Sequence, residues 1–230
     1  MKINIFNIII EKIEEKERDN VVIGIDGGQG SGKSTFTEEL QNYLRSILHR
    51  NSVHLETDDF LIERAKRKNL SLDFFTSLSN LNYFFDFDRM SKIIKKFQTS
   101  KNKIIVLNNL YNTKTGRRDR IKRYRFVDKN IIIVGGPYLL SPSFPQFDLK
   151  IFIHAERQTR LRNTLKRTLN KQRSIKSQTR LFNNFELFYI PYFSRRLFDY
   201  DLIVNNTDFE NKKIFTANDI FDLRGTYKKN

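Results

Sequence analysis

A glycine-rich stretch near the amino terminus constrains the fold of this chain more than any other feature. Residues 21–25 form a β-branched run, residues 27–32 are rich in glycine, and Lys33-Ser34-Thr35 opens a helix-like sequence. The stretch matches GxxxxGK[ST] in the strand–loop–helix context that the motif requires. Glycines let consecutive backbone N–H groups approach a polyphosphate, and the helix amino terminus adds partial positive charge. A turn without a ligand needs no Lys-Ser-Thr after it, so the stretch indicates a phosphate-binding loop (P-loop).

The residue types in this loop predict individual roles. Lys33 is expected to reach the β- and γ-phosphates of a nucleotide, and the Ser34 hydroxyl to bind Mg²⁺. The loop therefore predicts a nucleotide and Mg²⁺ as cofactors. We expect the nucleotide to be ATP, since no guanine-reading motif is visible. The predicted nucleotide-binding residues of the loop are Gly27, Gly28, Gln29, Gly30, Ser31, Gly32, Lys33, Ser34 and Thr35.

Length and charge narrow the classes of protein that the chain can represent. With 230 residues it is long enough for one α/β domain with a real core. The net charge of +16 suits polyanionic partners such as phosphorylated ligands or nucleic acid. The absence of cysteine excludes disulfides and thiol catalysis, and no segment approaches the ~20 apolar residues of a membrane span. We expect a cytoplasmic protein without membrane contact.

The order of apolar runs predicts the fold class. Expected strands alternate with helical patterns, which indicates an α/β, three-layer P-loop NTPase fold with a mainly parallel sheet, helices on both faces, a small β-hairpin insertion and a basic lid. The expected strands are 21–25, 52–55, 131–134, 149–153 and 202–204, with a hairpin from 104–107 and 123–127 and helices at 3–18, at 33–49, from 157 onward and near 219–223. We expect one domain over residues 1–230, with a core at about 20–206, a leading helix in 1–19 and a tail at 207–230.

Two carboxylates follow the expected strand 52–55, at the sheet edge where ligands bind in open α/β sheets. Asp58 or Asp59 there could take a proton from an attacking hydroxyl or hold Mg²⁺, although an aspartate in this place can also cap a helix. The three histidines, His49, His54 and His154, are scattered, and we expect structural or surface roles for them.

The ordered set of motifs resembles the uridine kinase and phosphoribulokinase family of P-loop kinases. Besides the P-loop, the matching stretches are Asp58-Asp59-Phe60, Phe85-Asp86-Phe87-Asp88, Tyr111 to Arg118, and Ile132-Ile133-Val134-Gly135-Gly136, followed by a basic lid. The resemblance implies that Asp58 is the general base and a metal-site residue. It implies acceptor-binding roles for Asp59, Asp86 (or Asp88), Tyr111 and Arg118. It also implies that Arg167, Lys171 and Arg173 close over the triphosphate, with the two arginines acting in catalysis.

The chain departs from the pattern of uridine kinases at informative positions. Gly135 stands where those enzymes have a glutamate that helps to organise Mg²⁺, so Asp58, Asp59 or Glu56 would have to serve. Leu61 replaces a tyrosine, and Gly116 replaces the histidine that reads uracil. Uracil recognition is therefore not supported, because a site without its hydrogen-bonding group loses selectivity strongly.

Three functional hypotheses follow from these residues. The leading one is an ATP- and Mg²⁺-dependent kinase that phosphorylates a hydroxyl of a small molecule, such as a nucleoside, sugar or vitamin-like acceptor. The second, motivated by Gly135 and Leu61, is a nucleotide-binding protein with weak or lost kinase activity. The third, motivated by the charge of +16, is a nucleic-acid-associated ATPase or kinase, which is disfavoured because no RNA-binding module is recognisable. The sequence leaves a homo-oligomer open.

Overall fold

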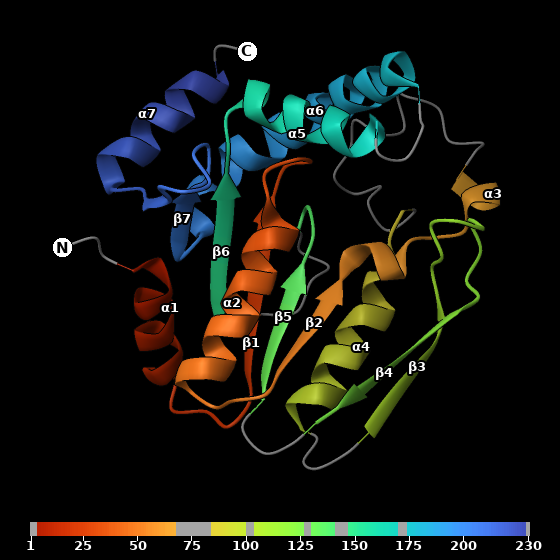
Figure 1. Ribbon diagram of the computed structural model, residues 1–230, viewed down its shortest axis with the longest axis vertical. Coiled ribbons are helices and arrows are strands. Elements are labelled where there is room, and N and C mark those ends of the chain that lie inside the picture. Colours follow the sequence, from red (N-terminus) through yellow and green to blue (C-terminus); the bar gives the residue numbers. More distant parts are fainter. Residues whose placement is uncertain are drawn as a thin grey trace.

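A central parallel sheet organises the computed structural model, which describes residues 4–67, 84–99, 104–126, 130–140, 147–169 and 174–228. The six-stranded sheet has the order β2-β5-β1-β6-β7-β8, and β3 and β4 form a separate antiparallel hairpin (Figure 1). The strands are β1 (Val21–Gly27), β2 (Ser52–Glu56), β3 (Ile104–Leu110), β4 (Arg120–Arg125), β5 (Ile131–Gly135), β6 (Leu149–His154), β7 (Leu202–Asn205) and β8 (Lys213–Ile214). Neighbouring strands from β2 to β7 run parallel, which confirms the predicted fold class.

The helices are positioned by their apolar faces and by the loops that connect them to the strands. Their bounds are α1 (Ile5–Glu14), α2 (Lys33–Ile47), α3 (Arg64–Arg67), α4 (Phe87–Gln98), α5 (Arg157–Leu169), α6 (Ile175–Arg196) and α7 (Ala217–Lys228), with short 3₁₀ turns η1 (Thr57–Phe60) and η4 (Leu197–Asp199). Figure 1 shows α5 and α6 crossing the end of the sheet at which the parallel strands finish. The predicted basic lid therefore lies over the edge where the P-loop begins.

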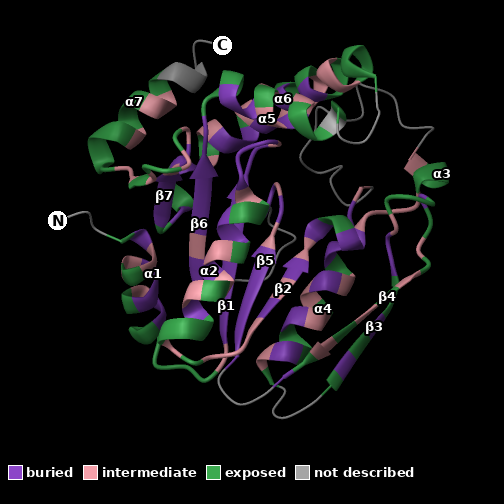
Figure 2. Ribbon diagram, viewed as in Figure 1, coloured by how far each residue is buried: buried purple, intermediate pink, exposed green. Residues whose placement is uncertain are grey.

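Two hydrophobic clusters pack against opposite faces of the sheet. Alternate residues of β1 and β5, such as Ile23 and Ile133, pack against α1 and α2. The residues between them, such as Val22 and Ile132, pack against α4 and the β3–β4 hairpin. Because it is covered on both faces, β1 is buried along its whole length, as its purple ribbon in Figure 2 shows.

The carboxyl-terminal third differs from the sequence-based expectation in two ways. α6 was not predicted as a separate helix, although it is the longest described element and packs Tyr189 and Phe193 over β6. The prediction that 202–204 is the last strand is wrong, because β8 adds an antiparallel edge beside β7. Within the described residues, no helix is both long and apolar enough to cross a bilayer.

Candidate active site

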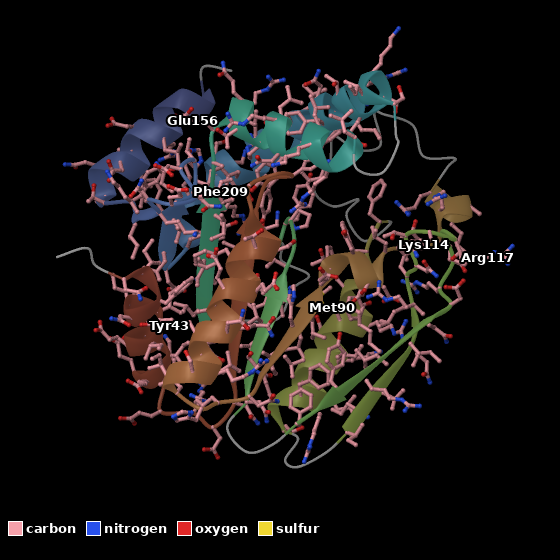
Figure 3. The ribbon with its side chains drawn as sticks, viewed as in Figure 1. Tyr43, Met90, Lys114, Arg117, Glu156 and Phe209 are labelled. Atoms are coloured by element: carbon pink, nitrogen blue, oxygen red, sulfur yellow. The ribbon has the colours of Figure 1, made fainter. Side chains whose placement is uncertain are left out.

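The P-loop lies between β1 and α2, as the motif predicts. Gly30 and Gly32 have φ angles of +77° and +88°, a backbone region that favours glycine. A Cβ atom on Gly30 would lie 2.1 Å from the Arg160 carbonyl oxygen of α5, and one on Gly32 would lie 2.5 Å from the Phe209 ring. The Phe209 side chain is labelled in Figure 3. Glycine is therefore needed at both positions for conformation and for space.

Two asparagines outside the motif hold this loop in place. The Asn163 side-chain amide of α5 donates to the Gly30 carbonyl at 3.0 Å, and the Asn206 amide donates to the Ser31 carbonyl at 2.7 Å. Neither residue was identified from the sequence, because nothing local distinguishes them from surface asparagines. The loop shape thus depends on elements far along the chain.

Lys33 points back into the loop. Its ammonium donates to the carbonyl oxygens of Gly27 and Gly28, the second at 2.9 Å. Burial lowers the pKa of Lys33 to about 8, and the negative charges of Asp26 and Asp58 oppose that change. An arriving phosphate would supply stronger anionic partners than these two carbonyl groups.

Asp26, the last residue but one of β1, joins four segments around the loop. Its buried carboxylate accepts hydrogen bonds from the backbone N–H groups of Gly27 (2.6 Å) and Leu139 (3.0 Å) and from the hydroxyls of Tyr192 (3.2 Å) and Tyr200 (2.7 Å). Burial raises the pKa of Asp26, and the bond from Tyr200 is the first of several that oppose the rise. Asp26 is thus a positioning residue, and no role for it was predicted from the sequence.

A pocket of about 420 Å³ opens beside the P-loop, a size typical of small-ligand sites. Its wall combines the loop and α2, the end of β2 with η1, the end of β5, and the lid helices. The lining residues are Gln29, Gly30, Lys33, Ser34, Thr37, His54, Glu56, Thr57, Asp58, Thr113, Gly135, Gly136, Pro137, Thr164, Arg167, Gln178 and Phe185. The predicted residues Lys33, Ser34, Asp58 and Arg167 therefore meet in one cavity.

The two neighbouring aspartates of η1 have different surroundings. The Asp58 side chain is open to the pocket, yet protein atoms surround it, and burial, followed by the charge of Glu56, raises its pKa. Asp59 is 2% exposed and forms ion pairs with Lys122 at 2.5 Å and Arg120 at 3.1 Å. Asp58 can meet a ligand, whereas the Asp59 carboxylate is already neutralised by the hairpin.

Three other predicted acceptor-site residues form a framework behind the pocket. Arg118 pairs with Asp86 at 2.9 Å and also donates to the carbonyls of Phe60 and Leu61. Tyr111 is buried, and its hydroxyl accepts from Arg67 at 2.7 Å. These residues join η1 to the hairpin, but none of the three lines the cavity.

The lid contributes one described cation to the pocket, Arg167 of α5. Lys171 and Arg173, the other predicted lid residues, lie outside the described residues. Arg160, which the sequence did not single out, forms a buried bidentate ion pair with Glu186 of α6, at 2.6 Å for each contact. Its guanidinium also lies against Gly28, where a Cβ atom would be 2.6 Å from Nη1.

His54 and Glu56 line the pocket from β2, a location that the expectation for His54 did not include. Burial lowers the pKa of His54, and the charge of Glu56 opposes the shift. Glu56 was already a candidate carboxylate from the sequence. The signal that could have identified His54 is strand periodicity, because residues two apart on a strand point to the same face and His54 lies two residues before Glu56 on β2.

Comparison with known proteins agrees with this geometry. A model of the Phosphoribulokinase / Uridine kinase family matches residues 22–210. The chain belongs to this family. No curated protein matches the chain by sequence.

Solved structures share the fold of this family member at low identity. One, described as a possible uridine kinase from Bacillus stearothermophilus, has 18% identity and a TM-score of 0.59, with 86% of this chain and 96% of that chain covered. D-glycerate 3-kinase from Cryptococcus neoformans var. grubii has 13% identity and a TM-score of 0.63, with 91% and 97% covered. The family match indicates a uridine kinase-like P-loop kinase, and this family generally uses ATP and Mg²⁺. The solved structures agree with it in fold.

Proposed function

We propose that this chain transfers the γ-phosphate of ATP to a hydroxyl of a small molecule. The observation that carries the proposal is that Lys33 and Ser34 of the P-loop and Asp58 of η1 line the same pocket of about 420 Å³. A phosphate-binding lysine and a carboxylate base on opposite elements of one cavity suit the transfer of a phosphoryl group between them.

Each residue has a definite task in this reaction. Asp58 takes the proton of the acceptor hydroxyl while the hydroxyl oxygen forms a bond to the γ-phosphorus, and the bond from that phosphorus to the β–γ bridging oxygen breaks to release ADP. Lys33 and Arg167 stabilise the negative charge on the transferring group. The raised pKa of Asp58 favours its action as a base near neutral pH.

The residues present also suit a magnesium ion. The Ser34 hydroxyl and the Asp58 carboxylate are hard oxygen ligands on one cavity, and Mg²⁺ binds through few protein oxygens together with substrate phosphates. When bound, the ion neutralises charge on the phosphates. The acceptor that we propose is a nucleoside, sugar or vitamin-like alcohol.

The test is ATP turnover with Mg²⁺ against a panel of nucleosides, sugars, glycerate, pantothenate and short RNA. We expect one small acceptor to stimulate turnover and gain phosphate. Lys33→Ala and Asp58→Asn should each lower kcat by about 10²- to 10³-fold, because each removes a group that acts in the transition state. Lys16→Ala, an exposed lysine remote from the pocket, is the control and should retain activity.

Other results would contradict the proposal. Full activity in Lys33→Ala or Asp58→Asn would overturn the role of that residue. ATP binding without turnover on any acceptor would favour the nucleotide-binding alternative, and stimulation by RNA alone would favour the nucleic-acid alternative.

A further inference from the structure

β2 and β5 bring two residues side by side at the edge of the pocket. The strands are parallel neighbours, and Glu56 is the register partner of Gly135. Both strands end at this edge, so positions 56 and 135 face the same region of the cavity. Whether a side chain from β2 or from β5 reaches the cavity depends on the space beside each of these two positions.

The end of β5 leaves no room for a side chain in the present arrangement. A Cβ atom on Gly135 would lie 2.7 Å from Nε2 of His54, so the imidazole occupies the space that residue 135 would use. A Cβ atom on Gly136 would lie 2.0 Å from Oγ1 of Thr57. β5 therefore presents bare backbone to the pocket, and any carboxylate on this wall has to come from β2 and η1.

The Glu56 carboxylate is only partly neutralised, because the lysine beside it lies closer to Asp59. Its nearest lysine, Lys122, lies 3.7 Å away and is 2.5 Å from Asp59. The Glu56 side chain is 43% exposed and lines the cavity with Asp58. The wall formed by β2 and η1 therefore carries two carboxylates, whereas the cations of the cavity, Lys33 and Arg167, come from α2 and α5.

Two buried hydroxyls on the same cavity give an independent indication of a ligand. Thr37 and Thr57 are each 1% exposed, and within the described residues neither Oγ1 atom has a hydrogen-bond partner. Thr37 follows Ser34 by one turn of α2, and both threonines line the pocket. Buried hydroxyls without partners are costly, which makes a polar ligand or its water shell a natural partner for them.

We infer that Glu56 supplies a second metal-side carboxylate of this site, beside Asp58, and that the divalent cation is held as a hydrated ion. The inference rests on the proposed function, because the cation enters with the nucleotide. Ser34 and Asp58 would bind the ion, while Glu56, Thr37 and Thr57 would accept hydrogen bonds from its water molecules. In the described part of the chain, no three acidic or histidine side chains could hold a bare ion, and Mg²⁺ usually keeps several waters.

The test compares ATP affinity with Mg²⁺ and with EDTA, measured by calorimetry on the whole protein. Glu56→Gln should weaken binding of Mg·ATP by about 10- to 100-fold, the usual cost of losing an outer partner of a metal site. Its affinity for ATP in EDTA should stay within about twofold of wild type, which also shows that the variant is folded.

Glu39→Gln is the matched control for this measurement. Glu39 is similarly exposed, at 40%, and pairs with Lys212 at 2.9 Å, but it does not line the pocket. We expect it to bind Mg·ATP as the wild type does.

Moving the carboxylate to the neighbouring strand gives a second test. In His54→Ala/Glu56→Gln/Gly135→Glu the imidazole no longer blocks residue 135, and we expect the Mg²⁺ dependence of ATP binding to return in part. Gly135→Glu added to Glu56→Gln with His54 in place should not restore it.

Two outcomes would overturn the inference. If wild type binds Mg·ATP and Glu56→Gln binds it equally well, the metal-side role of Glu56 is wrong while the proposed kinase stands. If wild type binds no ATP under either condition, both the proposed function and this inference are overturned.

Discussion

Lys33 is a buried lysine whose position suits a phosphate ligand but whose burial disfavours its charged form. Its ammonium is satisfied by two loop carbonyls, and burial lowers its pKa to about 8. Around neutral pH the residue is therefore mostly cationic, and it loses its proton as the pH rises through 8. Because triphosphate binding favours the charged form, binding and protonation are linked.

The affinity for ATP should fall as the pH rises from 7.5 to 9. Above a pKa of about 8 the free Lys33 is neutral and has to take up a proton when ATP binds, so calorimetry in buffers of different ionisation enthalpy should show proton uptake that grows through this range. Lys33→Met should bind weakly and without this uptake. If the variant and the wild type take up the same number of protons on ATP binding, the proton belongs to a group other than Lys33.

The two lid helices, α5 and α6, depend on each other through one buried contact. α5 and α6 are joined by the Arg160–Glu186 ion pair, with side chains 3% and 5% exposed, and Arg160 lies against the P-loop. Removing one partner of such a pair leaves a buried charge without compensation. The stability of the lid and the shape of the loop are therefore connected through this contact.

Glu186→Ala should lower the free energy of unfolding by about 3–5 kcal/mol, measured by urea denaturation. The control is Asp199→Ala, which removes the exposed Arg196–Asp199 pair and should cost about 1 kcal/mol or less. Arg160→Met/Glu186→Leu should recover much of the loss, since an apolar pair leaves no buried charge. Equal costs for the two single variants would mean that the buried pair is solvated.

The sequence of α6 explains why this helix was not predicted. Its buried positions Phe182, Glu186, Tyr189 and Phe193 recur at helical spacing, but a glutamate interrupts the apolar stripe and Pro191 lies inside the helix. Glu186 is acceptable in the core only because Arg160 meets it there. α2 has no such interruption, and its position was predicted closely.

The elements that we propose to contact the nucleotide lie on different sides of one cavity. The P-loop precedes α2, η1 follows β2, and α5 covers the same edge of the sheet (Figure 1). A ligand that contacts all three should stabilise the folded state as a unit, because it binds only when they are assembled.

Mg·ATP at 100 times its Kd should stabilise the protein by about 2.7 kcal/mol. For a chain of this size that corresponds to a rise in Tm of about 5–10 °C, measured by thermal denaturation with and without nucleotide. Lys33→Ala should show little shift at the same nucleotide concentration. A full shift in this variant would mean that ATP stabilises the protein at another place.

The sequence by itself determined the features that depend on local pattern. The P-loop, the apolar strands 131–134 and 149–153, and the amphipathic α2 could be predicted because glycine placement and side-chain periodicity act within a few residues. The ordered motifs then led to the family and to Asp58 as a residue of the pocket.

Only the tertiary structure decided which residues meet. Asp59 and Asp58 are adjacent in sequence, yet one pairs with the β3–β4 hairpin and the other faces the cavity. Glu56 lies beside Gly135 because β2 and β5 are neighbours in the sheet, although 79 positions separate them along the chain (135 − 56). Such contacts depend on strand order and helix packing, which local sequence does not encode, and for that reason the site could be located from the sequence but not completed.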